Sequence, residues 1–129
     1  PVLFKDVKST SVPEGKEVTG EWTTKEAESG LLLSIDKPTQ LHVLPLKQED
    51  SIGAKYVVYG VDTKDFDPTD PESGTLTELA HGTLTSARQD IELKKKSAAF
   101  DGALILFTDM PKSGSVTLEE ATLVGIPTN

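Results

Sequence analysis

Hydrophobic and polar residues alternate along several short stretches of the chain. In residues 16–24, Val18 and Trp22 fall on one side of an extended chain, and polar residues fall on the other. Residues 115–118 alternate in the same way. A period of two is typical of a β-strand that buries one face. The pattern therefore predicts a strand in each stretch, with one face toward a core.

Other stretches are apolar without alternation. Such a run indicates a strand that is covered on both faces. In one of these runs Pro45 lacks a backbone N–H, so it marks a sheet edge or a bulge. Residues 121–126 supply a further strand. The apolar stretches are residues 31–35, 40–46, 55–61 and 103–107.

Turn-forming residues separate these stretches at short intervals. The chain holds 10 glycines and 8 prolines, and clusters of turn residues recur between the apolar segments. Strand-length segments with frequent turns predict a single all-β domain over residues 1–129, a jelly-roll-like β-sandwich of about eight strands. Residues 62–74 carry two prolines and four aspartates, and are predicted to form the longest exposed loop.

One stretch carries both helix and strand signals. Ser86 and Gln89 form a capping box, and the three lysines of residues 94–96 lie where a helix dipole favours cations. The alternation in residues 87–93 instead predicts a strand, which we favour, although the helical interpretation of residues 87–100 stays open. We expect at most one or two helical turns. They are expected in residues 95–100 and in residues 23–29.

The composition limits the partners. With 21 acidic residues against 13 basic ones the net charge is −8, which repels the phosphates of nucleic acids and anionic membrane surfaces. No apolar run approaches the roughly 20 residues of a membrane-spanning helix, and no signal peptide is recognisable. We therefore expect neither nucleic acid nor membrane as a partner. The absence of cysteine excludes disulfides and thiolate metal sites.

An acidic loop is the candidate metal site. Asp62, Asp65, Asp67 and Asp70 lie close together in the sequence, and calcium takes six to eight oxygen ligands. The EF-hand spacing does not fit, because Leu76 stands where that motif requires its final glutamate. A solvated loop without a cofactor is the first interpretation, and a weak calcium site is the alternative.

Catalytic signals are scarce. His42 and His81 are far apart in the sequence, and the chain has neither a Gly-x-Ser-x-Gly elbow nor a phosphate-binding loop. Pro1 resembles in position the catalytic proline of the tautomerase superfamily, whose amine acts as a base. That resemblance implies an α/β fold with two long amphipathic helices, and the pattern of this chain predicts none. We therefore predict that the chain is not an enzyme; a small enzyme that uses Pro1 is the third hypothesis, after the two that follow.

The first functional hypothesis is a structural protein that docks on a larger assembly, such as a phage head decoration or tail component. Pro1 is what remains after Met is removed from a Met-Pro start, which favours a chain made in a cytoplasm and incorporated into a particle; a fragment that begins at proline is the alternative. Strand addition to a neighbour is the proposed contact, with a homo-oligomer or another protein as partner. The arm also fits an edge strand of the domain's own sheet. The docking arm comprises Val2, Leu3, Phe4 and Val7.

The second hypothesis is a carbohydrate-binding or adhesin module. Such modules stack sugar rings on exposed aromatic side chains. Among the aromatic residues of the chain, Tyr56, Tyr59 and Phe66 form the set that we expect to be exposed, and Phe66 lies on the predicted acidic loop. This hypothesis predicts a monomer with a glycan as its ligand.

Overall fold

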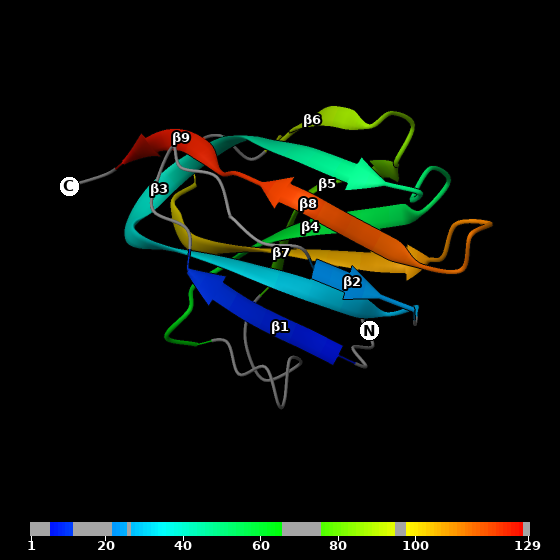
Figure 1. The fold of residues 1–129 in the computed structure, drawn as a ribbon. Helices are drawn as coiled ribbons and strands as arrows, with labels where there is room; N and C mark the ends of the chain where they lie inside the picture. The colour runs from blue at the N-terminus through cyan, green and yellow to red at the C-terminus, as the bar shows by residue number, and fades with distance from the viewer. Residues whose placement is uncertain (1–5, 12–21, 26, 66–75, 95–97, 128–129) are drawn as a thin grey trace.

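The computed structural model describes residues 6–11, 22–25, 27–65, 76–94 and 98–127 (Figure 1). All regular elements within these ranges are strands, which confirms the all-β class. None of the described residues forms a helix that is long and apolar enough to cross a membrane. The strands are β1 (Asp6–Ser11), β2 (Trp22–Thr24), β3 (Ser29–Glu49), β4 (Lys55–Val61), β5 (Leu76–Thr83), β6 (Arg88–Glu92), β7 (Phe100–Asp109), β8 (Val116–Ala121) and β9 (Val124–Pro127).

Strand β3 belongs to both layers of the molecule. Residues 29–34 pair with β1 on one side and β7 on the other, and residues 39–49 pair with β6 on one side and with β8 and β9 on the other. The register with β7 shifts between Ser34 and Thr39, where β3 passes from one layer into the other. Figure 1 shows β3 doubling back on itself. The sequence pattern predicted two separate strands here, and the structure joins them into one.

The two layers enclose the main core. One layer contains β1, β7, β4, β5 and the first half of β3, and the other contains β2, β8, β9, β6 and the second half. On β7, Ala103, Ile105 and Phe107 belong to the main core, whereas Leu104 and Leu106 belong to a second apolar cluster. Successive side chains of a strand point to opposite faces, so the second cluster lies on the other face of β7. This confirms the predicted β-sandwich and the burial of β7 on both faces.

A glycine allows a close contact inside the main core. Gly60 lies in β4, and an added Cβ would meet the ring of Phe100 at 2.6 Å. Phe100 packs against the main core from the start of β7. The ring therefore occupies the space that any side chain at position 60 would need.

Local structure differs from two expectations. The predicted helical turn in residues 23–29 is wrong, because β2 ends at Thr24 and a turn at Glu28, with φ of 68°, leads directly into β3. The helical turn expected in residues 95–100 does not reach Phe100, which begins β7; residues 95–97 lie outside the described residues.

The strand that we favoured in residues 87–93 is confirmed as β6. Ile91 is buried in the main core, and Arg88, Asp90 and Glu92 are exposed on the other side. The alternation of the sequence therefore gave the correct element and the correct inward face, and the helical interpretation of this stretch is wrong.

Candidate functional site

A shallow groove of about 330 Å³ crosses β4 and β5 and reaches β7. We call it the β4–β5 groove. It combines aliphatic surface with hydrogen-bonding side chains from three strands. Its lining residues are Lys55, Tyr56, Val57, Glu78, His81, Gly82, Thr83 and Thr108.

The strand register explains why these residues meet. Val57 of β4 stands opposite His81 of β5, and Lys55 stands opposite Thr83. Directly opposed residues project from the same face of a sheet. A register shift after these pairs places Glu78 opposite Tyr59. The shift changes the direction in which the following side chains of β5 project, as a β-bulge does.

Two exposed contacts join polar side chains at the groove. Nδ1 of His81 lies 3.3 Å from Oε2 of Glu78, and Nζ of Lys55 lies 3.7 Å from Oδ2 of Asp109. All four side chains are more than half exposed. Exposed pairs of this kind contribute little to stability. Their effect is to offer donors and acceptors together at one surface.

The tyrosines chosen from the sequence are not exposed. Tyr56 is 6% exposed and packs in the main core, and Tyr59 is 9% exposed in the second apolar cluster. Our expectation of two exposed rings was wrong, because each ring packs in an apolar cluster, on opposite faces of β4. Phe66 lies outside the described residues.

Burial also affects the tyrosine hydroxyls. Burial raises the pKa of Tyr56, and a side-chain hydrogen bond with Gln89 partly offsets that rise. The pKa of Tyr59 is raised by burial and further by the negative charge of Glu78. Both phenols therefore stay neutral across the physiological pH range, and neither acts as a base there.

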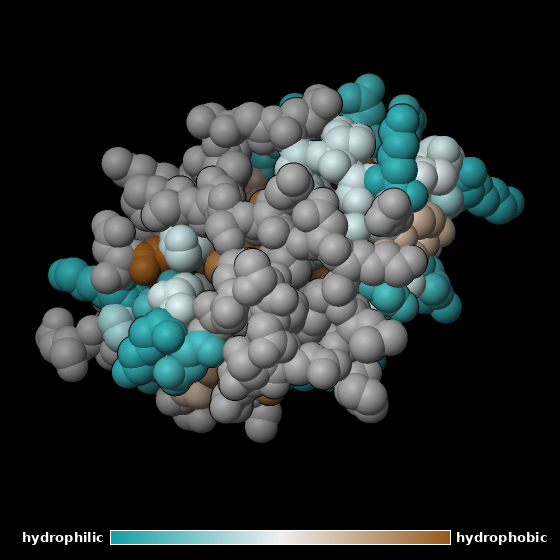
Figure 2. Space-filling view, turned by 90° about the horizontal axis from the view of Figure 1, so that it is seen from below, coloured by the Kyte–Doolittle hydropathy of each residue, from teal (hydrophilic) through white to brown (hydrophobic). Residues whose placement is uncertain are grey.

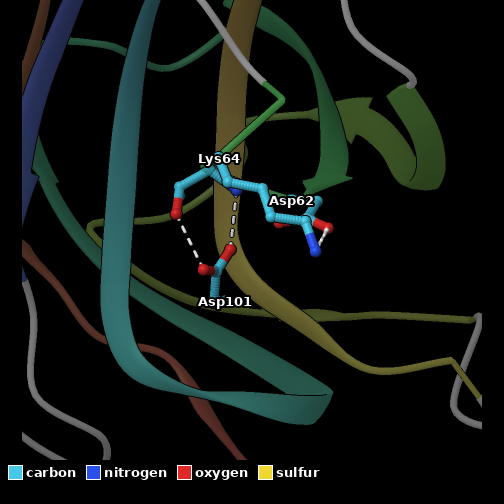
Figure 3. A network of polar contacts seen from close by, with 4 residues as sticks. Asp62, Lys64 and Asp101 are labelled. Atoms are coloured by element: carbon cyan, nitrogen blue, oxygen red, sulfur yellow. Dashed lines mark hydrogen bonds and ion pairs between the residues drawn. The ribbon is translucent and has the colours of Figure 1, made fainter.

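The described part of the acidic loop is organised by a carboxylate from β7 (Figure 3). Asp101 accepts hydrogen bonds from the backbone N–H and the hydroxyl of Thr63, each at 2.7 Å. Next to it, Nζ of Lys64 lies 3.5 Å from Oδ2 of Asp62, and the amide of Asp65 donates to the carbonyl of Asp62. Asp62 is therefore already paired with a cation of this chain.

The metal hypothesis rests partly on residues that the structure does not describe. Asp67 and Asp70 lie outside the described residues. Within the described ranges, no group of three or more His, Asp or Glu side chains is placed to hold a metal ion. The calcium site thus stays a prediction for these aspartates.

The docking arm is described only at its end. Val7 lies in β1, which runs parallel to β3 and places Val7 opposite Gly30. Residues 6–11 thus form a strand of the chain's own sheet, as the alternative interpretation of the arm expected. Val2, Leu3 and Phe4 lie outside the described residues, and docking on an assembly stays a prediction.

A second hollow of about 230 Å³ lies over β3, β6 and β8 in the other layer. Its floor includes Pro45, whose carbonyl accepts a hydrogen bond from the amide of Thr122. Pro45 is not at a sheet edge, because β3 is flanked here by β6 and β8; the register with β8 shifts two residues later. Lys47 and Arg88 border the hollow and each faces a glutamate, at 3.4 and 3.9 Å.

The coloured part of the surface in Figure 2 is mostly hydrophilic or neutral, with hydrophobic residues in small separate areas. The sequence pattern did not predict most of the β4–β5 groove; of its lining residues, only Tyr56 was expected to bind a ligand. Val57 gave no such signal, because its stretch is apolar without alternation and its partners depend on a register that the sequence does not display.

Comparison with known proteins supports the fold. No protein-family model matches the sequence, and no curated protein matches it by sequence. Among solved structures, a family 89 glycoside hydrolase from Clostridium perfringens, in complex with 2-acetamido-1,2-dideoxynojirmycin, superposes with a TM-score of 0.65 at 12% identity. The match covers 89% of this chain and 12% of the enzyme chain. At this identity the similarity concerns the fold of one part of the enzyme.

Proposed function

We propose that the chain is a non-catalytic carbohydrate-binding module and that the β4–β5 groove binds the sugar. The observation that carries the proposal is the combination of Val57 with hydrogen-bonding side chains on β5 and β7 in one open groove. A sugar ring presents C–H surface together with hydroxyl groups, so it needs both kinds of contact. Similarity in fold to part of a glycoside hydrolase supports a carbohydrate context.

The polar groups favour a neutral sugar. Glu78 accepts hydrogen bonds from hydroxyls, Lys55 donates them, and His81 does either according to its tautomer. The charges of Lys55 and Asp109 offset each other, and the net charge of −8 repels acidic glycans. The buried rings of Tyr56 and Tyr59 are not needed as stacking platforms in this arrangement.

Glycan binding tests the proposal directly. The protein is screened against an array of neutral glycans, and the best ligand is titrated by calorimetry. Glu78→Gln and His81→Ala should each weaken binding about tenfold, because a charged or aromatic hydrogen-bond partner is lost. Asp65→Asn is the matched control, since it removes an exposed carboxylate outside the groove. The proposal fails if no glycan binds, or if the groove variants bind as well as the control.

A further inference from the structure

The outer edge of β6 carries backbone groups that no described strand pairs with. The carbonyl of Ala87 accepts a hydrogen bond from β3, and the amide of Leu93 donates one to β3, each at 2.9 Å. Backbone groups of successive residues point to opposite sides of a strand. The N–H and C=O groups of Arg88, Asp90 and Glu92 therefore point away from β3. Among the described strands β6 pairs with β3 alone, and it lies at the upper margin of Figure 1.

Both ends of this edge are closed by the chain itself. The hydroxyl of Ser86 donates to the carbonyl of Arg88 at 2.6 Å. At the other end, the amide of Lys94 donates to the carbonyl of Leu79 in β5 at 2.9 Å. Among the described residues, none bonds to the outward backbone groups in the middle of the strand, at Asp90 and Glu92. An added strand would therefore be short and would have its register fixed at these two residues.

The side chains on this edge form an ordered charge pattern. Arg88, Asp90 and Glu92 alternate with inward residues, so they project from the same face. Arg88 approaches Glu120 at 3.9 Å, whereas no ion pair within the described ranges involves Asp90 or Glu92. Charges on an edge discourage unselective pairing, and the same charges favour a strand of complementary pattern.

We propose that the β6 edge binds an extended segment of a partner protein by strand addition. The segment runs antiparallel to β6 and carries basic residues opposite Asp90 and Glu92 and an acidic residue opposite Arg88. Main-chain hydrogen bonds supply the affinity and the cross-strand charges supply the selectivity. The net charge of −8 also attracts a basic partner. This interaction uses neither the residues nor the ligand of the β4–β5 groove.

The probe is a labelled peptide with Lys-Thr-Lys-Thr-Glu at its centre and threonines at both ends, measured by fluorescence anisotropy at low salt. It should bind about tenfold more tightly than the charge-inverted peptide Glu-Thr-Glu-Thr-Lys with the same ends. A version N-methylated at the amides that face β6 keeps its charges and should lose binding, because those hydrogen bonds cannot form.

A charge reversal on the protein supplies the second test. The double variant Asp90→Lys with Glu92→Lys should bind the charge-inverted peptide more tightly than the original peptide. This is a gain of binding, which a misfolded variant would not show. Asp62→Lys with Asp65→Lys makes the same change in net charge away from β6 and should keep the original preference. Equal binding of all three peptides, or an equal effect of both double variants, overturns the proposal. A dimer in light scattering would also overturn the proposal, if no peptide binds and Asp90→Lys with Glu92→Lys dissociates that dimer. The β6 edge would then bind a second copy of the chain.

Discussion

Replacing Gly60 by alanine should destabilise the domain, because the ring of Phe100 occupies the position of the new methyl group. That carbon would lie 2.6 Å from Cδ2 and Cε2 of the ring and 2.8 Å from Cγ, against roughly 3.5–4.0 Å for carbons in ordinary contact. Alanine gains roughly 0.5–1 kcal/mol over glycine in a strand through lower chain entropy, whereas overpacking a core costs roughly 1–3 kcal/mol. Contacts as short as 2.6 Å belong to the upper part of that cost, about 2–3 kcal/mol, so we expect a net loss of about 1–2.5 kcal/mol.

The assay is urea denaturation followed by the fluorescence of Trp22, the single tryptophan of the chain. Phe100→Leu removes ring atoms at the contact. The double variant Gly60→Ala/Phe100→Leu should therefore lose about 1 kcal/mol less unfolding free energy than the two single variants lose together. Strictly additive losses, or a Gly60→Ala variant as stable as the parent, would refute the reasoning that the ring causes the cost.

Three further predictions follow from polar contacts. Asp101→Ala should lower the free energy of unfolding by about 1.5–3 kcal/mol, because Thr63 loses two hydrogen bonds to a carboxylate; an unchanged urea midpoint would contradict this. Lys55→Ala should change stability by less than about 1 kcal/mol, because its ion pair with Asp109 is exposed, yet should weaken glycan binding in calorimetry; a larger loss of stability would show a structural role. Burial raises the pKa of Tyr59, so the unfolded chain ionises first and stability should fall as pH rises above about 10. Tyr59→Phe should reduce that alkaline fall in the melting temperature, and an identical pH profile would exclude Tyr59 as its source.

The pattern of apolar and polar side chains predicted most of the strands, because each position shows by its residue type whether it is buried. The apolar run of β7 and the alternation of β6 each reflect which faces are covered. Strand β5 was missed because Glu78, His81 and Gly82 interrupt its apolar residues, as expected for an exposed edge. The passage of β3 between layers was missed too, since it depends on the partners of each half.

The candidate site was harder to predict because it depends on neighbours that are distant in the sequence. Val57 meets His81 through the register of β4 and β5, and no local motif encodes that register. The apolar residues on both sides of β4 indicated a central strand, and the exposure that we assigned to Tyr56 and Tyr59 conflicted with that indication. Asp101 showed no signal at all, because its partner Thr63 lies 38 residues earlier.

The place of β3 in both layers has a consequence for biosynthesis. Four of the strands that flank it, β6, β7, β8 and β9, are encoded after it, so a ribosome must translate as far as β7 to complete one layer and as far as β9 to complete the other. Until then the leucine-rich first half of β3 leaves the exit tunnel without the β7 that later covers it. During synthesis this apolar surface is therefore exposed until the later strands emerge, which is the stage at which such segments are prone to aggregation.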